Sequence, residues 1–440
     1  MEELYRVAVV GAGPAGMFAS RELARNGAEV SLFNRDIKPG GLAEYGIYPD
    51  KHAMKDGLRN QFRQIIETPN LHYFGNLRVA QNGDLTLKDL RDLGYQAILV
   101  TIGAQGTKKL GLPGEDLPGV YHAKDVVYHY NALPPYSKMP FTFGQRVAVV
   151  GAGNVMMDIA RFLIQKMKVR EVTAIVRRGP MEVKFDKKET EELALNIDLD
   201  AFEAELARIA PALAAVGQTT KQARAFIDEA LPHAQPTGSN TRFRFRFLSS
   251  PAAILGQGAA QALLVDETEL TIRDGNIGVR TSGAQIELTF DSIVFAIGDT
   301  VDANFGLPLQ GGEYAKNPTP LYAQEETSFE AFDPQTGQPL EGIFVAGWAR
   351  QASTGLVGYA RRDGTLAARA VLQYLAAHKP VGSVLPRLNQ RLVKLTKTIV
   401  SNSDIQKLDV IERDIAAEKG LRSFKFATNQ EMLEKIMSIG

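Results

Sequence analysis

The sequence of 440 residues contains no cysteine. Without thiols, the chain cannot form a disulfide, a catalytic dithiol, a cysteine-ligated iron–sulfur cluster or a thiolate zinc site. If the protein transfers electrons, it therefore needs a bound organic cofactor. The histidines form no HxH or HExxH pattern, so the sequence predicts no metal site.

An excess of one charge and a long apolar run are also missing. Lysine and arginine total 50, and so do aspartate and glutamate, which gives no reason to expect a nucleic-acid partner. No apolar run approaches the roughly 20 residues that a membrane helix needs. The N-terminus, MEELYRVAVVGAG, carries acid rather than base and leads directly into a predicted strand, which leaves no room for a secretory signal. We therefore expect a cytoplasmic protein.

An internal repeat organises the chain. The octet RVAVVGAG occurs at 6–13 and again at 146–153. Each copy is a β-branched apolar run that ends in a glycine turn, and each turn opens an amphipathic helix, predicted at 14–27 and 154–168. A second apolar strand follows each helix, at 28–33 and 171–176. This strand–turn–helix–strand order is typical of dinucleotide-binding modules.

The chemistry of both turns is the same. The first glycine permits the tight turn, and the second lets the backbone approach a pyrophosphate. The helix N-terminus then presents free N–H groups and its positive dipole end to the phosphates. Two such modules in one cysteine-free chain indicate two dinucleotides, a flavin and a nicotinamide. The residues at these positions are Gly11, Gly13 and Gly16 in the first copy, and Gly151 and Gly153, with Met156 in the third position, in the second.

The ends of the second strands suggest which module binds which cofactor. In the second module this strand leads into Arg177 and Arg178, whose guanidinium groups match a 2′-phosphate, so we expect NADPH rather than NADH there. The first module should then hold FAD. Its second strand ends in Asn34 and Arg35, where FAD sites usually have glutamate. Asparagine still accepts a ribose hydroxyl bond, but as a neutral partner.

Several ordered motifs resemble the adrenodoxin-reductase type of ferredoxin–NADP reductase. They are PGGLAEYGIYPD at 39–50, GAGNVMMDIAR at 151–161, RRGPMEVKFDKKETEEL at 177–193, FRFLSSPAAI at 245–254, Gly347-Trp348 and TGLVG at 354–358. The resemblance spans about residues 5–375. In broader outline it extends to glutathione reductase, without that enzyme's dithiol. Glutamate synthase small subunits, a further candidate, carry N-terminal cysteine clusters that this chain lacks.

The resemblance implies roles for particular residues. Those expected to contact the ADP half of FAD are Ala15, Asn34, Leu42 and Val79, with Gly41 as a further cofactor-binding candidate, and those expected at its isoalloxazine are Trp348, Gly355, Leu356 and Val357. Those expected to hold NADP are Gly153, Asn154, Val155, Met156, Arg177, Arg178 and Glu189, and Gly355 is also expected next to the nicotinamide. Lys51 replaces a histidine of the bacterial members, and His52 follows it. With Glu192, these two are the candidate catalytic residues near the hydride path.

The predicted fold class is α/β, with two Rossmann-like dinucleotide-binding domains. Gly-Ala-Gln-Gly at 103–106 and Phe-Ala-Ile-Gly-Asp at 295–299 look like the crossover and the return. We therefore expect the NADPH domain, 107–300, to be inserted into the FAD domain, 1–106 and 301–383. Residues 186–232 should be helical. A helical tail, 384–440, either packs on the flavin domain or contributes to a dimer, so the protein is expected to be a monomer or a homodimer.

The expected reaction is hydride transfer from NADPH to flavin N5, followed by single-electron transfers to an external carrier. The resemblance implies that this carrier is of the ferredoxin type. Such carriers are acidic, so a basic docking surface is expected. Arg242, Arg244 and Arg246 share one face of the predicted strand TRFRFRF and are the candidate docking row. Two alternatives stay open. One is a flavin-dependent NADPH oxidoreductase or monooxygenase with a small organic acceptor, although the FxGxxxHxxxW linker motif is absent. The other is a non-catalytic flavin-binding redox sensor.

Overall fold

The computed structural model describes residues 3–438, which form two compact units. Unit 1 contains the chain up to Thr107, Tyr128–Lys138, and the chain from Gly298 onward. Unit 2 contains Lys108–Val127 and Met139–Ile297. Each unit contains one of the two glycine turns, so each dinucleotide module has its own sheet.

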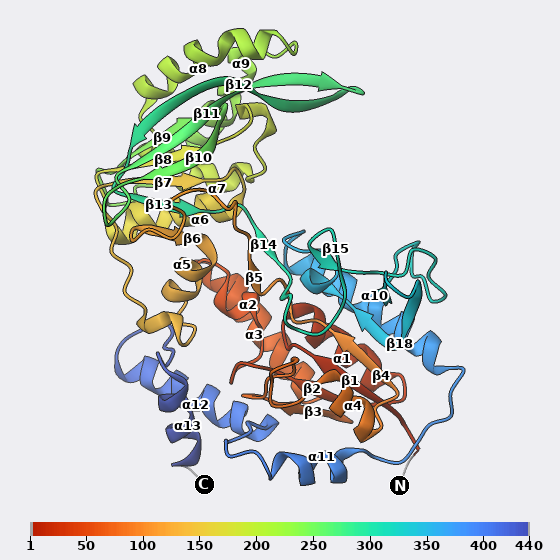
Figure 1. Ribbon diagram of the computed structural model, residues 1–440. Coiled ribbons are helices and arrows are strands. Elements are labelled where there is room, and N and C mark those ends of the chain that lie inside the picture. The colour runs from red at the N-terminus through yellow and green to blue at the C-terminus, as the bar shows by residue number, and fades with distance from the viewer. Residues whose placement is uncertain (1–2, 439–440) are drawn as a thin grey trace. The chain divides into compact units, whose positions relative to one another are not determined.

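Unit 1 is built on a six-stranded sheet in the order β17-β18-β4-β1-β2-β3 (Figure 1). Five strands are parallel, and only β17 runs antiparallel to its neighbour. The parallel strands are almost continuously apolar because helices cover both faces of the sheet. The strand bounds are β1 Tyr5–Val10, β2 Ala28–Phe33, β3 Leu71–Phe74, β4 Ala97–Val100, β17 Glu330–Asp333 and β18 Gln338–Val345.

Alternate residues of the strands in unit 1 enter two separate cores. Val7 and Val9 of β1 pack with α1 (Pro14–Arg25), α3 (His52–Ile66), α10 (Val357–Leu375), α12 (Asn402–Glu418) and α13 (Asn429–Met437). Ala8 and Val10 face the opposite core with α4 (Leu87–Leu93) and α11 (Leu385–Leu392). The period of two along a strand places neighbouring residues on opposite faces. The tail from residue 384 thus contributes to both cores of unit 1.

Unit 2 contains a fully parallel five-stranded sheet in the order β6-β13-β7-β8-β9. An antiparallel sheet of β10, β11 and β12 follows β9. The predicted helical stretch at 186–232 consists of α7 Lys187–Glu191, α8 Leu199–Ala214 and α9 Thr220–Ala230. The strand bounds are β6 Val120–His122, β7 Arg146–Val150, β8 Glu171–Ile175, β9 Arg242–Arg246, β10 Ser249–Leu255, β11 Ala262–Arg273, β12 Asn276–Thr289 and β13 Ser292–Phe295.

One segment departs from the predicted domain layout. Residues 128–138 fall inside the range expected for the NADPH domain, 107–300, but they group with unit 1. Tyr128 and Leu133 pack there with Tyr45 in a small apolar cluster. The segment carries no module signature of its own, so only its packing partners reveal where it lies.

Candidate functional site

The first glycine turn, between β1 and α1, has the geometry that a bound pyrophosphate requires. Gly11 has φ +108°, and a Cβ there would lie 2.6 Å from the carbonyl oxygen of Thr101. A Cβ on Gly16 would lie 1.9 Å from the carbonyl oxygen of Gly11, so α1 packs directly on the turn. A Cβ on Gly13 would meet no atom within 4 Å. The turn is therefore closed on its protein side and open at Gly13, where α1 begins.

Three helices at the predicted cofactor positions begin without a side-chain cap. They are α1 after Gly13, α6 (Asn154–Phe162) after Gly153 and α10 after Leu356. Elsewhere, α8, α9 and α12 each have a capping Asp, Thr or Ser that accepts a backbone N–H bond, whereas α3 and α11 also begin without such a cap. Uncapped N–H groups at a helix start bind anionic or polar ligand atoms. These helix starts are thus suited to two phosphate groups and a polar ring edge.

Asn34 at the end of β2 is buried beneath the first glycine turn. Its Oδ1 accepts the N–H of Ala12 at 3.2 Å. Its Nδ2 donates to the carbonyl oxygens of Asp36 and Lys38, both at 2.9 Å, and to the hydroxyl of Tyr73 at 3.0 Å. Asn34 therefore fixes the loop after β2 against the turn, a function that the sequence analysis did not foresee. A bond to a ribose hydroxyl stays a prediction that relies on the second lone pair of Oδ1.

The loop after Asn34 returns to the same turn. Gly41 has φ +49°, and a Cβ there would approach the Cα of Gly13 to 3.0 Å. Leu42 begins the short helix α2 (Leu42–Tyr45) immediately after it. Val79 is buried in the core that lies on the α4 side of the sheet. Gly41 thus borders the glycine turn, and contact of Gly41 and Leu42 with FAD stays a prediction.

The Gly347–Trp348 turn and the start of α10 form a second part of the site in unit 1. Gly347 has φ +64°, and a Cβ there would lie 2.8 Å from the Cβ of Ala15 on α1. The indole N–H of Trp348 donates to the carbonyl oxygen of Thr354 at 2.8 Å. This bond ties the tryptophan to the TGLVG segment, where Leu356 is 69% exposed. The two motifs expected at the isoalloxazine are therefore linked directly.

The second glycine turn, in unit 2, repeats the design of the first. A Cβ on Gly151 would lie 2.4 Å from the carbonyl oxygen of Ala296, and a Cβ on Gly153 would meet no atom within 4 Å. Asn154 donates to the Asp186 carboxylate at 2.7 Å and accepts the Asp186 N–H at 2.8 Å. These two hydrogen bonds fix the segment that leads into α7, the helix that contains Glu189.

The two arginines predicted to bind a 2′-phosphate lie just beyond β8. Arg177 is exposed and Arg178 half-buried. The carbonyl oxygen of Arg177 accepts a hydrogen bond from Thr268 Oγ1 at 2.8 Å, and that of Arg178 accepts one from the N–H of Leu248 at 3.2 Å. Among the described residues, no side chain pairs with either guanidinium. The backbone is fixed while both charges remain available to an anionic ligand.

The three candidate catalytic residues lie in different units. Lys51 immediately precedes α3, and His52 is its first residue, both in unit 1. Glu192 belongs to unit 2, where its carboxylate pairs with Arg161 at 3.1 Å. Glu192 therefore has a structural partner within its own unit. A proton-transfer function for these residues stays a prediction.

The arginines of the candidate docking row on β9 form ion pairs with acidic side chains that the local sequence pattern did not indicate. Arg242 and Arg244 pair with Glu171 at 3.3 and 2.8 Å, and Arg244 also pairs with Asp198. Arg246 pairs with Glu267 at 2.9 Å. The alternation itself is as predicted, because the phenylalanines of the strand are buried. The local charge of the row is, however, largely neutralised by neighbours far away in the sequence.

A buried charged cluster in unit 1 was missed by the sequence analysis. Glu44 accepts two bonds from Arg59, at 2.7 and 2.8 Å, and one from Lys425 at 2.8 Å. Burial alone would raise the pKa of Glu44, but Lys425 and Arg59 outweigh it and hold the pKa well below its usual range. Lys55 donates to Asn131 Oδ1 at 2.7 Å, and burial, together with Lys425, lowers its pKa to about 7. The contributing residues are too far apart in sequence to form a motif.

Within residues 3–438, no three or more His, Asp or Glu side chains are grouped so that they could hold a metal ion. In the same part of the chain, no helix is both long and apolar enough to span a membrane.

The chain is similar to proteins of known function along nearly its whole length. The family model described as pyridine nucleotide-disulphide oxidoreductase matches residues 5–197. NADPH-ferredoxin reductase FprA of Mycobacterium leprae is 28% identical, with 98% of each chain covered. Mitochondrial NADPH:adrenodoxin oxidoreductase of Bos taurus is 27% identical, with 98% of this chain and 92% of the relative covered. The structure of Mycobacterium tuberculosis FprA in complex with NADPH matches with a TM-score of 0.81 and 26% identity, over 99% of this chain and 100% of that one.

The fold and these matches define an α/β oxidoreductase with two dinucleotide-binding domains, which confirms the predicted fold class. Within this class, the predicted resemblance to the adrenodoxin-reductase type of ferredoxin–NADP reductase is also confirmed. The redox disulphide in the name of the family model has no counterpart here, because the chain has no cysteine.

Proposed function

We propose that the protein is an FAD-containing NADPH oxidoreductase that passes electrons to a ferredoxin-type iron–sulfur carrier. The observation that carries this function is the pair of glycine turns, one in each unit, which are both open at the second glycine and followed by an uncapped helix. The relatives named NADPH-ferredoxin reductase and NADPH:adrenodoxin oxidoreductase support the same assignment.

The residues of unit 1 fit FAD. Gly13 and the start of α1 would face the pyrophosphate, and Trp348 with the start of α10 would border the ring. When bound, FAD accepts a hydride from NADPH and returns the electrons one at a time. The protein supplies distance, orientation and polarity. The short approaches at Gly11 and Gly16 hold the turn rigid, so the open N–H groups of α1 are oriented before the cofactor binds.

The residues of unit 2 fit NADPH. Gly153 is open toward a phosphate at the start of α6, and Asn154 is held by Asp186. Arg177 and Arg178 would pair with the 2′-phosphate, which distinguishes NADPH from NADH. The relative of known structure is in complex with NADPH.

The electron acceptor is proposed to be an acidic, ferredoxin-like protein, and its docking surface is the finer part of the proposal. Among Arg242, Arg244 and Arg246, only Arg242 is exposed, with 51% of its side chain accessible. We propose that it contributes to docking, and that the two inner arginines act mainly through their ion pairs. Replacing Arg242 by alanine should reduce the salt dependence of carrier reduction. An unchanged salt dependence would remove this residue from the docking surface.

Anaerobic stopped-flow spectroscopy tests the function. The FAD-loaded protein would be mixed with NADPH and then with ferredoxins, flavodoxin, quinones or oxygen. We expect rapid loss of flavin absorbance with NADPH, a much slower loss with NADH, and the fastest recovery with a ferredoxin. Fastest recovery with a small organic acceptor or oxygen would favour the oxidoreductase or monooxygenase alternative. A flavin that NADPH does not bleach would favour the redox sensor.

A further inference from the structure

The part of unit 1 beyond residue 398 is hydrogen-bonded to the rest of the unit next to β3. Asn402 Oδ1 accepts the N–H of Tyr73, and its Nδ2 donates to the carbonyl oxygen of Ile66, both at 2.8 Å. The N–H of Gly75 donates to the carbonyl oxygen of Val400 at 2.8 Å. These bonds hold the start of α12 against the sheet. We call residues 400–438 the C-terminal segment.

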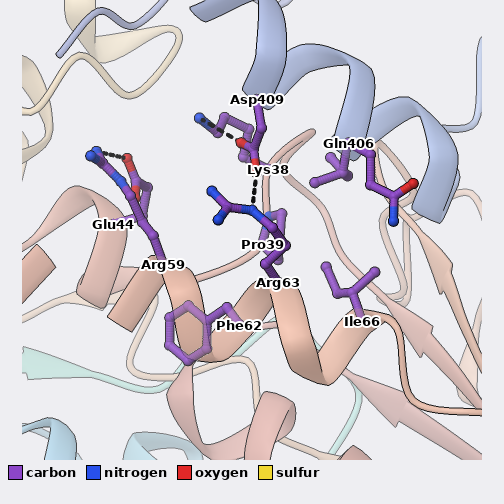
Figure 2. Close-up of a pocket in the computed structure, with 10 residues that line it drawn as sticks. Lys38, Pro39, Glu44, Arg59, Phe62, Arg63, Ile66, Gln406 and Asp409 are labelled. Carbon is purple, nitrogen blue, oxygen red and sulfur yellow. Dashed lines mark hydrogen bonds and ion pairs between the residues drawn. The ribbon is translucent and has the colours of Figure 1, made fainter. Parts of the chain in front are cut away.

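The C-terminal segment reaches the loop after β2 through a buried ion pair. Lys38 of that loop pairs with Glu412 of α12, and both side chains are 8% exposed. Asp409, one turn earlier on α12, lies 3.8 Å from Lys38 Nζ and 3.5 Å from Arg63 Nε, and Figure 2 shows it facing both side chains. Burial alone would lower the pKa of Lys38, but Glu412, Glu44 and Asp409 outweigh it and raise the pKa. Lys38 is therefore charged, and two of the three carboxylates that balance it, Glu412 and Asp409, lie on α12.

The loop that holds Lys38 is bonded directly to the first glycine turn. The carbonyl oxygen of Lys38 accepts a bond from Asn34 Nδ2 at 2.9 Å, and Asn34 Oδ1 accepts the N–H of Ala12 at 3.2 Å. The N–H of Gly40, two residues after Lys38, donates to the carbonyl oxygen of Ala12 at 2.7 Å. Glu412 is thus connected to the turn through Lys38 and Asn34.

A second connection runs through Lys425. Its Nζ lies 2.8 Å from Glu44 Oε1 and donates to the carbonyl oxygens of Glu44 and Asn131 at 2.9 and 3.2 Å. Glu44 belongs to α2, whose preceding residue, Gly41, packs against Gly13. The hydroxyl of Ser137 donates to the carbonyl oxygen of Ala427 close by in sequence. The C-terminal segment therefore contacts both ends of the loop that borders the turn.

The buried face of α12 contains the charged Glu412 among the apolar Ile405, Leu408 and Ala416. Removing charges from water is costly, and apolar side chains of similar size often stabilise a fold equally well. A buried pair does fix one geometry, because a shifted helix would leave each charge unpaired. At Lys38 this geometry determines the position of a loop that touches the glycine turn. The location of the pairs thus points to control of the turn rather than to general stability.

We propose that the C-terminal segment controls retention of FAD, by holding residues 38–44 against the first glycine turn through the Lys38–Glu412 and Glu44–Lys425 pairs. This inference rests on the proposed function, because it takes FAD to be the ligand of the first module. Lys38, Glu412 and Lys425 act as positioning residues and need not touch the cofactor. Loss of either pair should loosen the loop and speed the release of FAD.

The test compares FAD binding by the full-length protein and by the variants E412L, K38M, K38M/E412L and K425M. Free FAD is separated by ultrafiltration and measured by its absorbance, and the release rate is measured after dilution. We expect E412L to raise the FAD dissociation constant at least tenfold, because it removes the carboxylate nearest to the buried Lys38 and leaves only the more distant Asp409 and Glu44 to balance its charge. The double variant should bind FAD more tightly than E412L, because it leaves no unpaired charge. D414N, which changes an exposed residue of the same helix, should stay within twofold of wild type.

The outcomes separate this inference from the proposed function. If E412L and K425M are folded and bind FAD within twofold of wild type, control by the C-terminal segment is wrong while the flavoprotein assignment stands. If E412L does not fold, K425M decides the matter by the same criterion. If the wild-type protein has no affinity for FAD, both proposals are wrong.

Discussion

The buried carboxylate of Asp363 accepts a hydrogen bond from the backbone N–H of Gly347, with 2.6 Å between Oδ2 and N. The same carboxylate pairs with Arg350, whose NH2 lies 2.6 Å from Oδ1. Burial would lower the pKa of Arg350, but Asp363 outweighs it and raises the pKa. Asp363 thereby fixes the left-handed turn at Gly347 that presents Trp348. An aspartate in the second turn of a helix gives no sequence signal for such a function.

Replacing Asp363 by asparagine should destabilise unit 1. Arg350, only 11% exposed, would lose its counter-charge, and breaking a buried pair costs about 3–5 kcal/mol. Denaturant unfolding measures this change. The matched control, Asp414→Asn, removes a carboxylate that is 65% exposed and should cost less than about 0.5 kcal/mol. Equal effects of the two substitutions would show that the Asp363 pair has no special importance.

Trp348 is the single tryptophan of the chain, so its emission reports on one position. If it borders the flavin ring, FAD added to the apoprotein should quench most of this emission, because the flavin absorbs where indole emits. The titration should saturate at one FAD per chain. The variant Trp348→Phe, which has no tryptophan, gives the background emission. Emission that persists at saturating FAD would place Trp348 away from the ring.

The double substitution Arg177→Ala with Arg178→Ala should weaken NADPH binding by about 2–4 kcal/mol, at roughly 1.5–3 kcal/mol per charged hydrogen bond. Binding of NADH should hardly change, because it has no 2′-phosphate. Dissociation constants for both coenzymes are the measurement. Arg170→Ala, an exposed change just before β8, is the control. Equal losses for NADPH and NADH would refute the assignment of these arginines.

Two glycine-to-alanine substitutions should have opposite effects on stability. A Cβ on Gly364 of α10 would lie 2.2 Å from the carbonyl oxygen of Ala15 on α1, so G364A should destabilise the protein by about 3 kcal/mol. A Cβ on Gly57 of α3 would meet no atom within 4 Å. In that exposed helical position, G57A should stabilise by about 0.5–1 kcal/mol. Denaturant midpoints test both, and a neutral G364A would contradict the close approach of α1 and α10.

Stability should depend on pH through Lys55. Its pKa of about 7 in the folded chain lies below the ordinary value of 10.5. Between these values the unfolded chain binds more protons, so the contribution of Lys55 to the free energy of unfolding rises with pH, by up to about 1.4 kcal/mol per unit. The difference in the free energy of unfolding between wild type and Lys55→Met, measured from pH 7 to 10, gives the contribution of Lys55. A difference that does not vary with pH would mean that Lys55 titrates normally.

The sequence by itself determined the two dinucleotide modules, the class of the fold and the absence of a redox dithiol. These features are local or compositional. A glycine turn between a strand and a helix is contained in a dozen consecutive residues, and a missing residue type is missing from every conformation. The arginines after β8 could be named as candidates for the same reason, because their proposed pairing with a 2′-phosphate depends on their position at the end of one strand.

Only the tertiary structure decided which charges are available and what holds the turns in place. The arginine row on β9 alternates as predicted, yet Glu171, Asp198 and Glu267 neutralise much of it from other elements. Glu412 reaches Lys38 across more than 370 positions of the chain. Side-chain charge is a property of the sequence, but its effect depends on distance and burial. Those quantities are set only when the chain folds and brings such residues together.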